Sequence, residues 1–240
     1  MDTTFWALTA AGLVTGFSKF STGGMGLIIL PILTIAFPGP EAVAILVPMY
    51  IATDVMAVSS YRSQISWKTL LRIIPIAFIG IIIGTYLLAH LDNDSFTTML
   101  GVLIISMLTL SIWIDISKST FLQRPIVIQC ISFLAGIVTT IANAAGPLIS
   151  ILLLDQKLSK ESYVATRAWT FMIINVLKLP MLMAIGLMNM EIAKHSLVAF
   201  PPLIIGAMIG YYVLKKLNLN QFKWLIRIMA TIAAIKLLVF

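Results

Sequence analysis

The sequence predicts an all-α polytopic membrane protein built from two inverted repeats. Three observations support this: an apolar composition, apolar runs of membrane-spanning length, and an internal repeat whose two copies carry opposite charge in one loop. Hydrophobic residues make up 60% of the 240 residues and charged residues 10%, against about 25% charged residues in a soluble domain. Because no long polar stretch interrupts the chain, we expect one transmembrane domain over residues 1–240, with repeats at 5–118 and 125–240.

A set of spaced residues recurs 126 positions later in the chain. The first copy consists of Pro75, Ile79, Gly80, Gly84, Tyr86, Leu88, Leu91 and Phe96, and its counterparts are Pro201, Ile205, Gly206, Gly210, Tyr212, Leu214, Leu217 and Phe222. The loop of the first copy is acidic, with Asp92 and Asp94, whereas the second copy has Lys215, Lys216 and Lys223. Since Lys and Arg concentrate on the cytoplasmic side of a membrane, we predict that the two copies face opposite sides.

The apolar runs cover roughly 5–37, 41–60, 70–90, 97–115, 126–154, 163–186, 195–214 and 221–240. A bilayer is crossed by about 20 residues of helix, so six runs have the length of one span. The runs 5–37 and 126–154 are too long, and each contains glycine and small polar residues near its middle, the second also a proline. These residues favour a broken helix.

Two topologies compete. If each long run is a re-entrant or broken hairpin, each repeat has one hairpin and three transmembrane helices, and the odd number of spans inverts the second repeat. This topology places Arg62, Lys68 and Arg72 inside and Asp92 outside. The alternative is eight full spans with parallel repeats, which puts the basic cluster that begins at Lys215 outside and violates the charge rule.

Each hairpin tip is expected to begin a half-helix near the membrane midplane. Irregular backbone at that depth is tolerated only inside protein or beside a water-filled cavity. Helix N-termini carry partial positive charge and free N–H groups, so two such tips facing each other predict a site for a small anion. The predicted tip residues are Ser21, Thr22, Gly23, Gly24 and Gly26 in the first half and Asn143, Ala144, Gly146 and Pro147 in the second.

Charged residues inside apolar runs are costly and usually functional. Lys19 lies beside the first tip, where it is predicted either to contact the anion, to snorkel, or to pair with a carboxylate. Arg167 is predicted to bind an oxyanion or to anchor the inner end of its span. Lys178 is expected to snorkel or to be paired.

Asp54 lies within the second apolar run, and alignment of the repeats sets it opposite Asn175. We predict Asp54 as a proton-coupling acid, with a structural ion pair to Lys19 or Arg167 as the alternative.

Other functional classes lack support in the sequence. The net charge of +7 comes from basic residues in short loops, which indicates membrane topology and no nucleic-acid partner. The lone Cys130 and the two histidines form no metal-ligand pattern, and no hydrolase motif is present. We therefore predict neither enzyme activity nor a cofactor or metal.

The two tips resemble the sulfite exporter TauE/SafE (TSUP) family. The matching residues are Gly23-Gly24-Met25-Gly26 with Pro31-Ile32-Leu33, Gly146-Pro147-Leu148, Ala165-Thr166, Asn175 and the two glycine pairs of the repeat. The resemblance runs from about residue 8 to the end and departs from fuller glycine runs at Met25 and at Asn143-Ala144-Ala145. It implies a multi-pass transporter of sulfur-containing anions in a bacterial-type plasma membrane. We extend the predicted substrate-binding site to Thr166 and Asn175 on this basis.

The leading hypothesis is a secondary transporter, an exporter, of sulfite or organosulfur anions that works by alternating access at the paired tips. The alternatives are a passive anion channel and a transporter of other small carboxylate-type anions. The expected partners are a small anionic solute and the lipid bilayer, with proton coupling through Asp54 as an option. The sequence makes no prediction of the oligomeric state.

Overall fold

The computed structural model describes residues 3–20, 26–60, 64–116, 124–154, 156, 158–214 and 235. Across these ranges the regular structure is helical, and no strand occurs in them. In chain order the helices are α1 (Thr3–Phe20), α2 (Gly26–Thr34), α3 (Glu41–Ser60), α4 (Trp67–Ala89), α5 (Asn93–Ile116), α6 (Pro125–Ala142), α7 (Gly146–Leu154), α8 (Lys160–Ala184), α9 (Met190–Val198) and α10 (Phe200–Leu214). The prediction of an all-α protein is confirmed.

Both long apolar runs are divided into two helices, as the sequence predicts. The run 5–37 forms α1 and α2 on either side of residues 21–25, and the run 126–154 forms α6 and α7. The second break begins at Asn143, whose backbone is left-handed with φ 50° and ψ 27°. Asparagine tolerates this conformation better than most residues, and its N–H donates to Thr139 O at 3.1 Å. The break therefore has a local cause in the sequence.

Five helices, α3, α4, α5, α6 and α8, are long and apolar enough to cross a membrane by length and composition. The pair α9–α10 passes the same test as one unit bent by 44°, which gives up to six spans in the described residues. The bend was not predicted; it lies where Pro201 and Pro202, which lack N–H donors, begin the second helix. The last predicted run, 221–240, lies outside the described residues except for Ile235.

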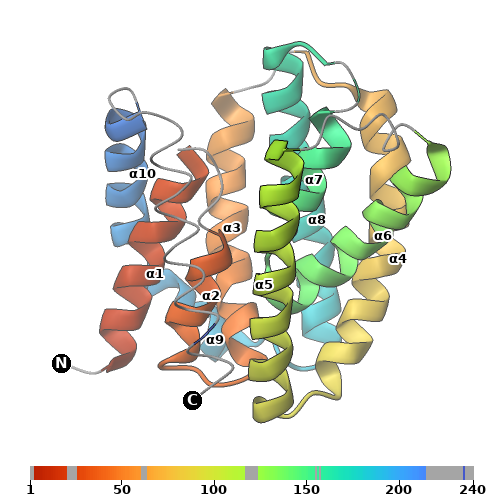
Figure 1. The fold of residues 1–240 in the computed structure, drawn as a ribbon. Coiled ribbons are helices and arrows are strands. Elements are labelled where there is room, and N and C mark those ends of the chain that lie inside the picture. The colour runs from red at the N-terminus through yellow and green to blue at the C-terminus, as the bar shows by residue number, and fades with distance from the viewer. Residues whose placement is uncertain are drawn as a thin grey trace.

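The two hairpins open toward opposite ends of the molecule (Figure 1). The α1–α2 hairpin opens at the lower end of the view and the α6–α7 hairpin at the upper end, and α3 and α8 run in opposite directions. At the upper end Ser159 Oγ donates to Gln64 Oε1 at 3.4 Å. At the lower end the rings of Phe37 and His195 lie 5.1 Å apart. These directions agree with inverted repeats, whose arrangement in a membrane stays a prediction.

The two ends also differ in charge. The upper end carries Lys68 and Arg72 in the first turns of α4, while the lower end carries Asp92 and Asp94 at the start of α5. Asp92 Oδ1 accepts the N–H of Ser95 at 2.7 Å, and this hydrogen bond lowers the pKa of the Asp92 carboxyl. The acidic loop thus also caps α5, because a side-chain oxygen satisfies a free N–H group of the first turn.

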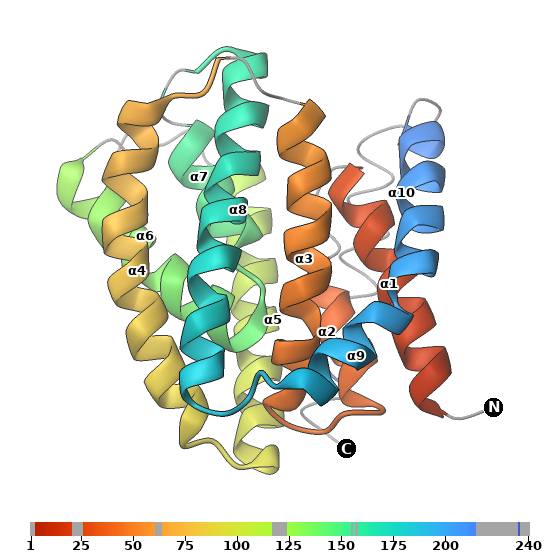
Figure 2. The same ribbon diagram turned by 180° about the vertical axis from the view of Figure 1, so that it is seen from behind.

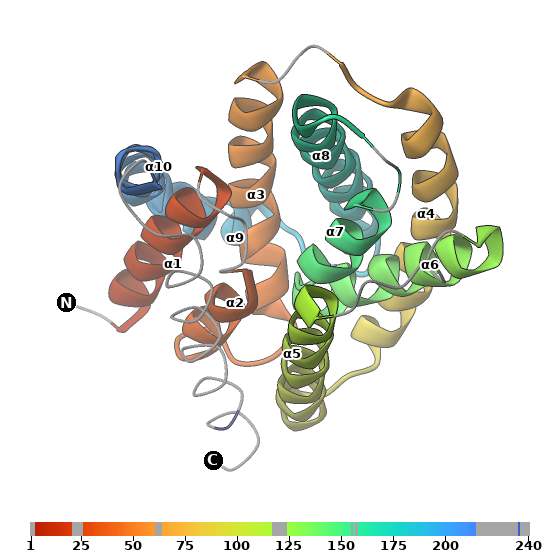
Figure 3. The same cartoon turned by 45° about the horizontal axis from the view of Figure 1, so that its top comes forward.

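Close contacts between distant segments join the two halves. Helix α4 packs along α6, and α1 packs along α10, on opposite flanks of the central pair α3 and α8 (Figures 2 and 3). A Cβ added to Gly136 would lie 2.0 Å from Ala77 O, and one added to Gly206 would lie 2.1 Å from Leu13 O. Only glycine allows such backbone approach, so these two glycines are points of close helix contact.

We expect Gly136→Ala to destabilise the protein because its methyl group would clash with the α4 backbone. Overpacking of this kind costs about 1–3 kcal/mol, and each kcal/mol lowers Tm by about 2–4 °C in a chain of this size. Thermal unfolding of detergent-purified protein measures the shift. Leu134→Ala, on the same helix at a side chain that is 48% exposed, is the control and is expected to change Tm less. An equal shift in both variants would contradict the close α4–α6 contact.

Candidate functional site

The two breaks, taken as the start of α2 and the connection between α6 and α7, lie next to each other inside the molecule. Gly26 is the first residue of α2, and a Cβ placed on it would lie 3.6 Å from Asn143 O and 3.8 Å from Tyr50 Oη. The start of α2 is therefore adjacent to the connection between α6 and α7. Gly146 and Pro147 begin α7, and Ala144 is buried between the two helices. The predicted tip residues Ser21, Thr22, Gly23 and Gly24 lie outside the described residues.

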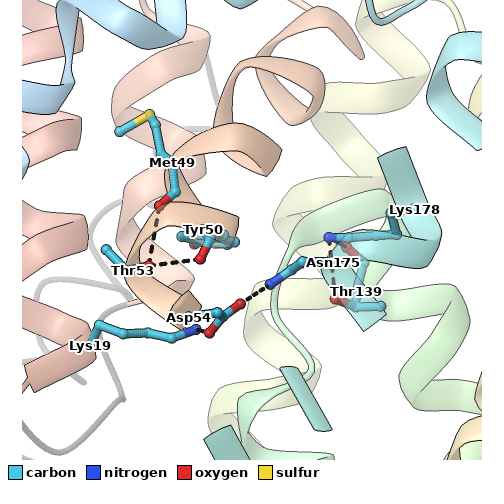
Figure 4. Close-up of polar contacts among 8 residues, drawn as sticks. All are labelled: Lys19, Met49, Tyr50, Thr53, Asp54, Thr139, Asn175 and Lys178. Carbon is cyan, nitrogen blue, oxygen red and sulfur yellow. Dashed lines mark hydrogen bonds and ion pairs between the residues drawn. The ribbon is translucent and has the colours of Figure 1, made fainter. Parts of the chain in front are cut away.

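A buried carboxylate links both halves of the chain. Asp54 on α3 is 0% exposed; its Oδ1 forms an ion pair with Lys19 Nζ from the end of α1. Its Oδ2 accepts a hydrogen bond from Asn175 Nδ2 on α8 at 2.7 Å (Figure 4). The ion pair is the alternative that the sequence left open for both Lys19 and Asp54. Alignment of the repeats paired Asp54 with Asn175, and the structure brings these two residues into direct contact.

Two aromatic rings flank the ammonium group of Lys19. Its Nζ lies 5.5 Å from the ring centroid of Tyr50 and 5.0 Å from that of Phe171. Cations at this distance are attracted by the negative faces of aromatic rings. Lys19 is 20% exposed at its side chain, so the rings and the carboxylate hold a charge that water still reaches in part.

Lys178 on α8 is a second buried cation, and its side chain is 0% exposed. Its Nζ donates to Thr139 O at 3.1 Å and makes a short hydrogen bond to Asn143 Oδ1. Both acceptors lie at the C-terminal end of α6, where the helix dipole favours a positive charge. Among the described residues no carboxylate lies within ion-pair distance of Lys178. A buried ammonium is thus held by neutral oxygens at the second break.

Two buried donors beside the breaks have no hydrogen-bond partner within the described ranges: Tyr50 Oη and Asn143 Nδ2. Leaving such a group unsatisfied costs about 1–3 kcal/mol, and an unpaired buried donor calls for a water or a ligand. Thr53, on the same turn of α3 as Tyr50, is already satisfied because its hydroxyl donates to the carbonyls of Met49 and Tyr50 (Figure 4). Tyr50 Oη and Asn143 Nδ2 are therefore two open donors at the place where the breaks meet, while Thr15 Oγ1, Arg167 Nε and Trp169 Nε1 are open elsewhere in the described residues.

Two predicted residues, Thr166 and Arg167, lie nearer the start of α8, at the upper end of the molecule. Thr166 Oγ1 accepts the N–H of Ser66 at 3.0 Å, so Thr166 fixes the approach to α4, and the structure does not bring it to the breaks. The guanidinium carbon of Arg167 lies 5.5 Å from the ring centroid of Phe171, the ring that Lys19 also contacts. Arg167 and Lys19 thus lie against the same aromatic ring.

The sequence analysis missed Tyr50 and Thr139 and treated Lys178 as snorkelling or paired. The available signal was the position of Lys178 inside α8, in a stretch that is otherwise largely apolar. Tyr50 carried a weaker signal, since the same alignment that pairs Asp54 with Asn175 sets Tyr50 opposite Phe171.

Comparison with known proteins gives one match. The family model described as Sulfite exporter TauE/SafE matches residues 8–237, which include both breaks and every helix that contributes to the site. No curated protein and no solved structure matches the chain. The resemblance found in the sequence is confirmed.

The contribution of the Lys19–Asp54 ion pair to stability can be tested by removing each charge in turn. Removing one partner of a buried ion pair costs about 3–5 kcal/mol because the other charge is left uncompensated, although the partial exposure of Lys19 reduces this. We expect Lys19→Met and Asp54→Asn each to lower Tm, and the double variant to lose less than the sum of the two. A double-mutant cycle by thermal unfolding measures the coupling. Strictly additive losses would show that the two side chains do not interact.

Proposed function

Because the chain belongs to the sulfite exporter TauE/SafE family, we propose that it is a secondary transporter that exports a small sulfur-containing anion such as sulfite or a sulfonate. The family implies membrane transport of anions and no enzymatic activity, and the helices are those of a multi-pass membrane protein. The observation that carries the proposal is the meeting of the two helix breaks, Gly26 against Asn143, beside a buried ammonium and two unpartnered donors.

The proposed binding site lies between the breaks, with the predicted residues Gly26, Asn143, Gly146 and Pro147 around it and Lys178 added. Helix N-termini at Gly26 and Gly146 favour an anion there. Asp54 and Lys178 are 0% exposed, which supports a closed state rather than an open pore. Transport then requires the site to open to each end in turn. Rocking of one half against the other, along the α1–α10 and α4–α6 contacts, is the proposed movement.

The proposed membrane orientation follows the charge on the two ends. The end with Lys68 and Arg72 faces the cytoplasm, and the end with Asp92 and Asp94 faces outward, in a bacterial-type plasma membrane.

Proton coupling through Asp54 is part of the proposal. Lys19 is partly exposed to water, and an opening of the site that separates it from Asp54 would leave the buried carboxylate without its cation, a state that protonation relieves. Asp54→Asn is then expected to remove the dependence of transport on a pH gradient, and full dependence in this variant would exclude Asp54 as the coupling acid.

We expect sulfite or a sulfonate to stabilise the purified protein and chloride to have little effect. The panel comprises sulfite, thiosulfate, sulfoacetate, taurine, acetate and chloride, read by thermal shift and by counterflow in proteoliposomes. A ligand at 100 times its Kd stabilises the folded state by about 2.7 kcal/mol. Selective stabilisation by acetate would instead indicate a carboxylate transporter. Flux too fast for a conformational cycle would indicate a channel. No response to any anion in either assay would contradict the proposal.

Asn143→Gly tests the site itself. Glycine keeps the left-handed backbone at this position and removes only the amide side chain. Loss of its hydrogen bonds is expected to weaken anion binding about tenfold to a hundredfold. Gln64→Gly is the matched control, because Gln64 also has a positive φ, 68°, but lies in the upper loop. Equal affinity in wild type and Asn143→Gly would remove Asn143 from the site.

A further inference from the structure

Three charged groups gather around the two breaks: Lys19, Asp54 and Lys178. Lys178 lies one helical turn after Asn175, the residue that donates to Asp54. Lys19 and Asp54 form an ion pair and cancel each other, so one positive charge, that of Lys178, remains uncompensated in the described part of the cluster. An unpaired ion inside a protein destabilises the fold unless a counter-charge neutralises it.

The neutral contacts of Lys178 do not use its full capacity. An ammonium has three N–H donors. Two of them reach Thr139 O and Asn143 Oδ1, whereas the next acceptor, Thr139 Oγ1, lies 3.5 Å away, at the limit of a hydrogen bond. One donor of the ammonium therefore has only a marginal partner.

The two unpartnered donors belong to residues that adjoin Gly26 at the breaks. Asn143 joins Lys178 through Oδ1 and leaves Nδ2 unpaired, and Tyr50 Oη lies beside Gly26, which itself adjoins Asn143. We propose that these groups form a site for one monovalent oxyanion, with Lys178, Asn143 and Tyr50 as its contacts. The Lys19–Asp54 pair is neutral overall, so the single charge of Lys178 sets the charge of the anion that the site accepts. The inference rests on the proposed transport function and adds that the transported anion carries one negative charge.

The charge balance explains the preference for one negative charge. A monovalent anion cancels the charge of Lys178 and leaves the interior neutral. A divalent anion leaves one excess negative charge close to the Asp54 carboxylate, and such like-charge repulsion excludes it. Arg167 is half-buried beside Phe171, farther toward the upper end, and lies outside this balance. The site therefore selects a sulfonate or a singly protonated oxyanion over a dianion of similar shape.

The test compares methanesulfonate with sulfate, two tetrahedral anions of similar size but different charge, at one pH and constant ionic strength. Binding to the full-length purified protein is measured by calorimetry and thermal shift. Wild type is expected to bind methanesulfonate at least about tenfold more tightly than sulfate. Lys178→Met is expected to weaken methanesulfonate binding about tenfold to a hundredfold, whereas Lys178→Arg, which keeps the charge, retains the preference.

Variants of the Lys19–Asp54 pair test the preference for a monovalent anion independently of Lys178. Asp54→Asn removes one negative charge, so the preference is expected to shift toward sulfate. The double variant Lys19→Met/Asp54→Asn again has one net positive charge and is expected to regain the preference for methanesulfonate. These two variants decide the question if Lys178→Met does not fold, as judged by gel filtration and circular dichroism.

Equal affinity of wild type for the two anions, an unchanged preference in Asp54→Asn, or undiminished methanesulfonate binding in folded Lys178→Met would each overturn the inference. Failure of the wild type to bind any anion contradicts the proposed function instead. The two failures are therefore distinct.

Discussion

The architecture depends on charged groups in the interior of the helix bundle. Asp54 on α3 is reached by Lys19 from α1 and by Asn175 from α8, and Lys178, one turn beyond Asn175, is bound to the end of α6. Each of these contacts joins different helices, and the hydrogen bond between Asn175 and Asp54 joins the two halves of the chain. Because an unmatched charge in an apolar interior is strongly destabilising, these helices must keep their positions for the charges to be satisfied. The interior is therefore specified by polar contacts as well as by apolar packing.

The helix breaks follow from the same constraint. A continuous helix satisfies its own backbone groups, but a break at membrane depth leaves free N–H and C=O groups that only protein, water or ligand can satisfy. At the second break Lys178 donates hydrogen bonds to the carbonyl of Thr139 and to the amide oxygen of Asn143. The start of α2 approaches the same place. The glycine contacts of α4 with α6 and of α1 with α10 bring the halves close enough for these groups to meet.

The sequence predicted the elements better than the contacts between them. Both breaks were predictable because glycine, proline and small polar residues interrupt runs that are otherwise apolar, and Asn143 has a left-handed backbone at its break. The partnership of Asp54 with Asn175 was predictable from the repeat. The roles of Tyr50 and Lys178 were not, because the contacts of a lone lysine or tyrosine in an apolar helix are made with residues more than 20 positions away in the chain. Thr166 matched a motif, yet its hydrogen bond to Ser66 depends on the α3–α4 connection.

The central claim is that two inverted halves meet at their helix breaks. Side-specific labelling tests it most directly: single cysteines at Asp92 and at Lys216, introduced into a Cys130→Ala background, are exposed to a membrane-impermeant thiol reagent in intact cells. The account predicts that the cysteine at position 92 reacts from outside and the one at position 216 only after the membrane is opened. Reaction of both positions from the same side would contradict the inversion of the repeats.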